Sequence, residues 1–102
     1  MSKVSFLAKL TAKEGKGDEL VAAFEPIFDQ VAKEPGTLLY ALNRAKDNPD
    51  VFWFTELYTD ADALAAHGAS DAMAQAATAF GSLIADSGLV IGEPVRAKGL
   101  PD

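Results

Sequence analysis

The stretch TLLYALNRAKDNPDVFWFTELYT, residues 37–59, decides the fold of this chain. It contains two runs of mostly aliphatic and aromatic residues, 37–46 and 51–59, separated by the sequence DNPD. Asn, Pro and Asp favour tight turns, because Pro fixes one backbone dihedral angle and the short polar side chains bond to nearby backbone groups. The stretch therefore predicts an antiparallel β-hairpin with residues 47–50 as its loop.

The expected loop also sets which side chains share a face of the hairpin. A four-residue loop pairs Lys46 with Val51, and successive side chains of a strand point to opposite faces. This register places Glu56 on a mostly apolar face, together with Leu39, Ala41, Asn43, Phe52, Phe54 and Tyr58. The opposite face then carries Tyr40 and Arg44, which we assign to a dimer core. A slip of one residue would exchange the two faces.

The segments on either side of the hairpin complete an α+β pattern. Residues 4–11 alternate as a strand, and residues 16–33 have apolar residues at helical spacing, with a kink expected at Pro26. After the hairpin we expect helices over residues 61–67 and from Ser70 to residues 87–88, and a last strand over 89–98. This order, βαββααβ, is typical of a ferredoxin-like α+β fold with one antiparallel sheet. We expect residues 1–102 to form one such domain.

The strands are apolar on both sides, whereas the helices of this fold cover only one face of the sheet. Leu7, Trp53 and Leu57 all fall on the side that the register assigns to the second face. An exposed apolar sheet face is unfavourable in water and is usually covered by another sheet or by helices. We therefore expect a homodimer in which two sheets pack face to face.

The composition excludes several classes of function. The chain has no Cys, one His, and nine Lys and Arg against fifteen Asp and Glu, for a formal net charge of −6. Without Cys there is no thiolate metal site or Cys nucleophile, and a single His does not favour a zinc site. The negative charge disfavours nucleic-acid binding, and the apolar runs are too short for a membrane span or a signal peptide. We expect a cytoplasmic protein without metal, nucleic-acid or membrane partners.

Glu56 is the unusual residue of the first hairpin face. It stands between Phe54 and Tyr58, where a carboxylate is costly to bury unless it is paired or protonated. One interpretation is structural: Glu56 bonds to a nearby backbone N–H or to a Lys. The other is an aromatic-walled pocket in which Glu56 and Asn43 are among a few polar groups that bind a ligand.

His67 is the only side chain whose ordinary pKa lies near neutrality. It follows Glu56 by eleven residues, which is enough for a short helix to turn back over the sheet. In one hypothesis, Glu56 bonds to one ring nitrogen of His67 and orients the other toward a ligand. In the other, His67 ends a helix and interacts only with the helix dipole.

Several of these residues occur together in a known family. The chain resembles the antibiotic biosynthesis monooxygenases through the ordered set Glu34-Pro35-Gly36, Tyr40, Asn48-Pro49, Glu56, Tyr58, Asp62-Ala63-Leu64, His67 and Ser70. The family commonly has Trp at the position of Tyr58. The resemblance covers about half of the chain directly, and it implies the fold known as the dimeric α+β barrel.

The resemblance implies a cofactor-independent monooxygenase that oxidises a small electron-rich aromatic with O2, such as a quinol, an anthrone or a polyketide-like phenol. Such a substrate must lose a proton before it reduces O2, so the site needs a base and a dry pocket. We assign His67 as the base, Glu56 as its orienting carboxylate, and Tyr58, Asn43 and Phe54 as substrate-binding residues. Two other functions stay open: a cofactor-free isomerase or lyase acting on a small hydroxycarbonyl, and a non-catalytic dimer that binds a small molecule.

Overall fold

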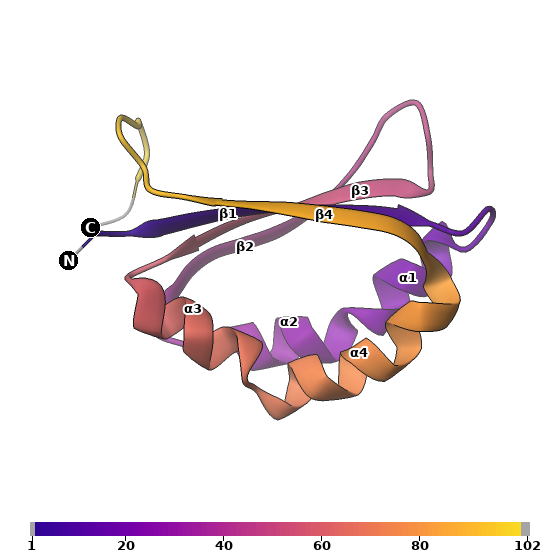
Figure 1. Cartoon of the computed structure of the whole chain (residues 1–102), viewed down its shortest axis with the longest axis horizontal. Helices are drawn as coiled ribbons and strands as arrows, with labels where there is room; N and C mark the ends of the chain where they lie inside the picture. Colours follow the sequence, from indigo (N-terminus) through magenta and orange to yellow (C-terminus); the bar gives the residue numbers. More distant parts are fainter. Residues whose placement is uncertain (1, 101–102) are drawn as a thin grey trace.

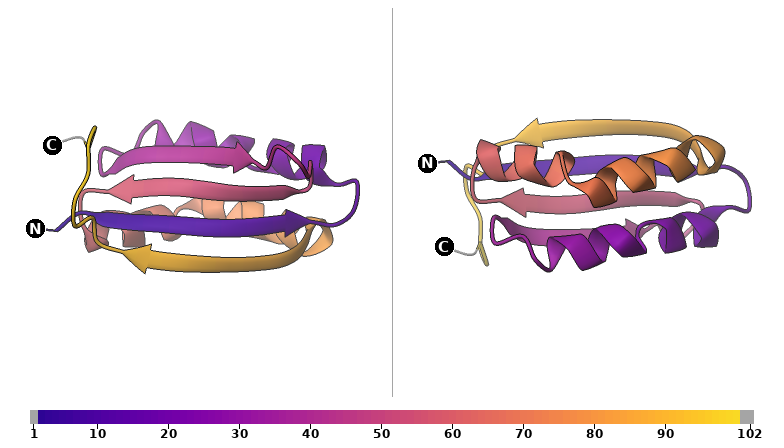
Figure 2. Two further views of the ribbon diagram at one scale, coloured as in Figure 1. Left: turned by 90° about the horizontal axis from the view of Figure 1, so that it is seen from above. Right: turned by 90° about the horizontal axis from the view of Figure 1, so that it is seen from below.

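The computed structural model describes residues 2–100 and has one four-stranded sheet with its helices on a single face (Figure 1). All neighbouring strands are antiparallel, in the order β2-β3-β1-β4 (Figure 2). This is the predicted ferredoxin-like α+β fold. In chain order the elements are β1 (Val4–Ala12), α1 (Gly17–Ala23), α2 (Glu25–Val31), β2 (Thr37–Arg44), β3 (Val51–Tyr58), α3 (Ala61–Gly68), α4 (Asp71–Leu83) and β4 (Ile84–Gly92).

The kink expected at Pro26 is a complete break, which divides the predicted helix into α1 and α2 at Phe24. Pro26 has no N–H to donate to the preceding turn, but it fits the first turn of a new helix, where that N–H has no partner anyway. The break leaves Phe24 between the two helices, with its ring against Phe54 and Phe80 at centroid distances of 4.8 and 4.9 Å. Phe24 is thereby part of the core between the helices and the sheet.

The predicted hairpin is present, but its expected register is wrong by one residue. Tyr40 pairs with Glu56 and Leu42 with Phe54, so Tyr40, Leu42 and Arg44 share the helix-covered face with Glu56. Arg44 lies over the ring of Phe52 and bonds to Asp18 of α1, which excludes it from the outer face of the sheet. Asn43 moves to that outer face instead.

The cause of the different register is a tertiary contact of the loop. The Ala45 backbone N–H donates to the carbonyl of Val51, which makes residues 46–50 a five-residue loop. Asp50 faces the turn after β1, where its carboxylate accepts from the backbone N–H groups of Gly15 and Gly17 at 3.0 and 2.9 Å. The Asp50 carbonyl also accepts from Ala12. These bonds hold Asp50 against the β1–α1 turn rather than in the short loop that the sequence suggested.

The last strand also differs from its expected range of 89–98. β4 follows α4 without a loop and contains Ser87 and Gly88, which we expected to end the helix. The Leu83 carbonyl at the end of α4 accepts from the Lys13 backbone N–H, so β1 provides the bond that a further helical turn would have made. Pro94 lies beyond the strand.

The position of α3 is set by a local helix cap at its start and by a close contact with Gly36. The Asp60 carboxylate accepts from the Ala63 backbone N–H, as an N-cap does, and Ser70 caps α4 in the same way. Gly36 allows the turn before β2 to approach α3 closely, because a Cβ at this position would lie 2.5 Å from the Cβ of Ala63. The residues that precede Gly36 are thereby placed next to the helix that carries His67.

The face of the sheet opposite the helices carries exposed aliphatic side chains. Leu7 is 47% exposed, Leu39 44% and Val90 67%, and all three lie on this outer face. The helices of the described residues are too short or too polar to span a membrane.

We expect Gly36→Ala to lower the free energy of unfolding by about 1–3 kcal/mol, because the added methyl group must displace α3. Gly81→Ala is the matched control: a Cβ at Gly81 meets no atom within 4 Å, and Ala favours a helix interior by up to about 1 kcal/mol. Urea unfolding followed by circular dichroism measures both changes. Equal stabilities of the two variants would contradict the close approach of α3 to Gly36.

Candidate functional site

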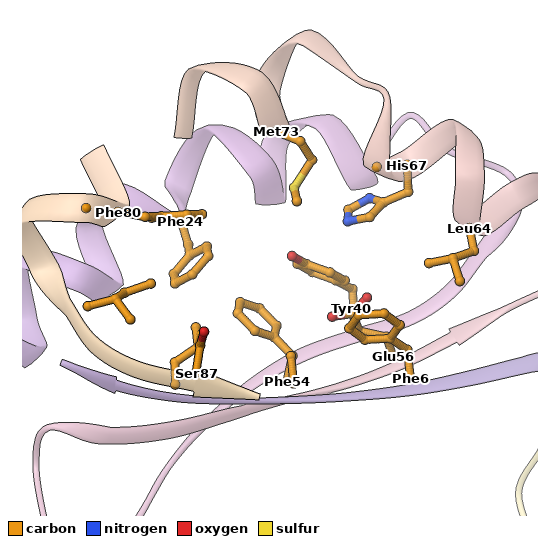
Figure 3. A pocket seen from close by; sticks show the side chains of 15 residues that line it. Phe6, Phe24, Tyr40, Phe54, Glu56, Leu64, His67, Met73, Phe80 and Ser87 are labelled. Atoms are coloured by element: carbon orange, nitrogen blue, oxygen red, sulfur yellow. The ribbon is translucent and has the colours of Figure 1, made fainter. Parts of the chain in front are cut away.

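A cavity of about 530 Å³ lies between the sheet and helices α3 and α4 (Figure 3). Most of its walls are apolar, and they come from β1, β3, α3, α4, the first residue of β4 and Phe24 at the junction of α1 and α2. The apolar side chains are Phe6, Ala8, Leu10, Phe24, Phe54, Leu64, Met73, Phe80 and Ile84. The polar side chains are Tyr40, Glu56 and His67, together with Ser87 of β4. A volume of this size suits a small organic molecule.

His67 lies on α3 at one end of this cavity and is 4% exposed. Its Nδ1 atom is 2.9 Å from Oε1 of Glu34, a residue of the turn before β2 that lies 33 positions earlier. Figure 3 shows the imidazole ring extending from α3 toward the ring of Tyr40, and the two ring centroids are 5.0 Å apart. His67 is therefore held from behind by Glu34 and faces the cavity in front.

Three donors surround the Glu34 carboxylate. Besides His67, the Thr37 hydroxyl donates at 2.7 Å and the Gln30 side-chain amide at 3.1 Å. Burial raises the pKa of Glu34, but the hydrogen bonds from Thr37, His67 and Gln30 outweigh it, so the pKa lies below its ordinary value. A carboxylate can only accept, so Nδ1 of His67 carries the proton of this bond. In the neutral ring, Nε2 is then the basic atom.

Glu56 has a different partner from the one that we expected. It is 6% exposed, and one of its carboxyl oxygens accepts from the Tyr58 hydroxyl. Burial raises the pKa of Glu56, and the hydrogen bond from Tyr58 and the nearby His67 offset this only in part. The described residues contain no hydrogen bond between Glu56 and His67. Glu34, rather than Glu56, is the carboxylate that orients the histidine.

The three expected substrate-binding residues occupy different places. Phe54 lines the cavity, as expected. Tyr58 is completely buried behind the cavity wall and donates its hydroxyl to Glu56, so its hydroxyl does not face the cavity. Asn43 lies on the outer face of the sheet, where its amide donates to the Trp53 carbonyl and the Thr55 hydroxyl, each at 3.1 Å. The error in the hairpin register accounts for the misplacement of Asn43.

Two residues of the site, Glu34 and Tyr40, were missed as functional groups. The wrong register put Tyr40 on the outer face, whereas the structure places it in the cavity. Glu34 belongs to the Glu-Pro-Gly sequence, which follows the predicted helix 16–33 and contributes to the family resemblance, but the sequence analysis gave Glu34 no role in the site. The pair of Glu34 with Thr37 three residues later was the available local signal for a structured turn.

The described residues contain no group of three or more His, Cys, Asp or Glu side chains that could hold a metal ion. The polar atoms at this end of the cavity are one imidazole, one carboxyl group and one phenol. Such a set can accept a proton from a ligand and donate a hydrogen bond to it.

Solved structures of other proteins share this fold. Among solved structures, a provisionally assigned antibiotic biosynthesis monooxygenase from Caulobacter crescentus CB15 is 31% identical, with a TM-score of 0.86 and coverage of 93% of this chain and 92% of that one. A protein from Shewanella oneidensis is 26% identical, with a TM-score of 0.86 and 91% coverage of both chains. A search of curated proteins finds no match.

The fold is that of a ferredoxin-like α+β protein with an apolar cavity between its sheet and its helices. Residues 4–79 match the family described as antibiotic biosynthesis monooxygenase, which is well over half of the 102 residues. This chain belongs to that family, as the sequence resemblance predicted. The match includes the Glu34 turn, the hairpin and the helix of His67.

We expect Glu34→Gln to change the proton distribution on the His67 ring, because an amide can donate to Nδ1 as well as accept from it. Nitrogen NMR of the single histidine should show the proton on Nδ1 in the unmodified protein and a mixture of the two neutral tautomers in the variant. The loss of the charged acceptor should also lower the free energy of unfolding by about 1–3 kcal/mol. An unchanged tautomer in the variant would contradict the orienting role of Glu34.

Proposed function

We propose that this protein is a cofactor-independent monooxygenase that oxidises a small hydroxylated aromatic with O2, and that His67 is its base. The observation that carries the proposal is the partly buried hydrogen bond between Glu34 and His67 at the polar end of an otherwise apolar cavity. Membership of the monooxygenase family supports the same reaction class. Glu34 takes the orienting role that the sequence assigned to Glu56, and Glu56 contributes to the polar end of the cavity.

The first step is the transfer of a proton from the substrate to Nε2 of His67. The imidazolium that forms lies beside the Glu34 carboxylate, which stabilises the positive charge in a site with little water. The substrate becomes an anion, and an electron-rich aromatic anion can reduce O2 directly. The apolar walls favour O2 entry and exclude water from the reactive intermediate.

The overall reaction balances without an added reductant. An anthrone-type CH2 group loses two hydrogen atoms and gains one oxygen atom from O2, while the second oxygen atom leaves as water. The substrate supplies all four electrons that O2 accepts. The protein therefore has to provide only the base, the binding site and protection from water.

We expect protein-dependent O2 uptake with at least one member of a panel of hydroquinones and anthrones, measured with a metal chelator present and no flavin or nicotinamide added. His67→Ala should lower the rate by about 10²–10⁴-fold, because general-base catalysis contributes this much. Gln75→Ala, on the exposed side of α4, is the matched control and should leave the rate unchanged. Panel compounds without protein give the rate of autoxidation.

Uptake that His67→Ala does not reduce, or no uptake above autoxidation with any compound, would contradict the proposal. In the second case, His67-dependent exchange of a substrate C–H proton for deuterium would favour the isomerase or lyase alternative. Ligand binding without either reaction would favour the binding dimer.

We also propose that two copies associate through the outer faces of their sheets, in the cytoplasm, as the sequence suggested. The exposed Leu7, Leu39 and Val90 support this arrangement, because an apolar patch on a strand face is stabilised when a second sheet covers it. The helix-covered face already has its own core, so the outer face is the surface available to a second copy.

Leu7→Asp should convert the dimer into a monomer in sedimentation velocity, because it places a charge in the middle of the proposed contact. Val21→Asp is the matched control, since Val21 is 40% exposed on α1 and lies away from the outer face. The control should remain a dimer at the same concentration. A monomeric unmodified protein, or equal effects of the two variants, would overturn the proposed interface.

A further inference from the structure

Tyr40 presents an unpaired hydroxyl group to the cavity. Its ring is held by three neighbours, with centroid distances of 5.1 Å to Phe28, 4.8 Å to Phe54 and 5.0 Å to His67. Figure 3 shows the hydroxyl oxygen pointing into the open centre of the cavity. Among the described residues this hydroxyl has no hydrogen-bond partner, so it is free to donate to a ligand that enters the cavity.

The other tyrosine of the chain shows the contrast. Tyr58 is also in contact with His67, at a centroid distance of 5.6 Å, but its hydroxyl is already used by Glu56 and does not line the cavity. In Tyr40, by contrast, packing fixes the position of the ring, and the hydroxyl group remains available to donate a hydrogen bond. A fixed donor loses little conformational entropy when it binds a ligand.

Burial and two nearby carboxyl groups keep Tyr40 in its neutral form. Burial, together with the carboxyl groups of Glu56 and Glu34, raises the pKa of the Tyr40 phenol far above its ordinary value. The phenol therefore keeps its proton throughout the physiological range. It acts as a hydrogen-bond donor and not as a second base.

We propose that Tyr40 is a catalytic residue that donates a hydrogen bond to the substrate oxygen from which His67 removes the proton. This inference rests on the proposed function, because it assigns the second contact of the same oxygen. The substrate O–H bond breaks and its proton goes to Nε2 of His67, while the electron pair remains on the substrate oxygen. Tyr40 keeps its own proton and stabilises the new negative charge.

The position of the two residues also defines the kind of ligand. His67, Tyr40 and Glu56 form the polar end of the cavity, whereas Phe24, Phe54 and Phe80 form an aromatic wall. The site therefore fits an aromatic molecule with its ionisable hydroxyl at the His67 end and its ring system along that wall.

The test uses 4-nitrophenol, a phenol that O2 does not oxidise and whose anion is identified by its visible absorption. Titration of the bound probe with pH gives the ratio of bound anion to bound neutral phenol. The unmodified protein should increase this ratio relative to water, and Tyr40→Phe should lower it by about 10–100-fold, while circular dichroism checks that the variant is folded.

Tyr58→Phe is the matched control because it removes the other phenol hydroxyl close to His67. It deprives Glu56 of a donor to its charged form, so it favours neutral Glu56 and should not lower the fraction of bound anion. With an oxidisable substrate, Tyr40→Phe should reduce kcat about 10²–10³-fold with little change in KM.

An anion ratio equal to that in water, or an equal ratio in Tyr40→Phe and the unmodified protein, would overturn the role of Tyr40. This result is separate from the test of the proposed function, since the probe needs no O2. Absence of O2 uptake together with a Tyr40-dependent anion ratio would overturn the oxygenase and keep Tyr40 as an anion-stabilising residue.

Discussion

The hydrogen bond between Glu34 and His67 joins the turn before β2 to helix α3 at the polar end of the cavity. Glu34 lies in the turn between α2 and β2, and His67 lies on α3, the helix that follows the hairpin. Gly36 makes their approach possible, because only a residue without a side chain fits against Ala63. The orientation of the histidine depends on this contact, whereas the Asp60 cap and the packing of Ala63 on Gly36 place the helix that carries it.

The two carboxyl groups near His67 lie in different surroundings. The Glu34 carboxylate lies behind His67 and is surrounded by donors, which favours its charged form. Glu56 lies nearer to the cavity, where burial disfavours its charge and Tyr58 supplies a hydrogen bond. Two carboxyl groups close to one histidine are thus distinguished by their surroundings, and their different environments assign them different roles.

Much of the fold could be predicted because local sequence preferences, such as helix caps and proline, favour the same elements that the tertiary structure contains. Asp60 and Ser70 cap helices where their side chains predict it, and Pro26 interrupts the first helix. The end of α4 could not be found in this way, because its apolar spacing continues through Ile84 into a strand. Its end is set by Lys13 of the β1–α1 turn, which is distant in sequence.

The candidate site was predicted only in part for the same reason. His67 and Phe54 were recognised from their residue types and surroundings, and Glu56 was recognised as an unusual buried acid. The register of the hairpin depends on the contact of Asp50 with Gly15 and Gly17, which lie more than thirty positions away. Because this long-range contact was not foreseen, the two faces of β2 were exchanged in the prediction, and Tyr40 was assigned to the outer face of the sheet. Glu34 was hidden because a helix-ending sequence explains its position without any function.

The two ends of the cavity are built from different kinds of contact. The His67 end is cross-linked by side-chain hydrogen bonds, and the arrangement of its polar atoms is accordingly stiff. The opposite end is closed by Phe24, which lies where one helix stops and the next begins, and by Phe80 of α4. Contact between apolar rings is non-directional, whereas a hydrogen bond requires a specific position of donor and acceptor. Under the proposed function, the hydrogen-bonded end would specify where the hydroxyl of the substrate lies, and the ring-lined end would contact the rest of the molecule.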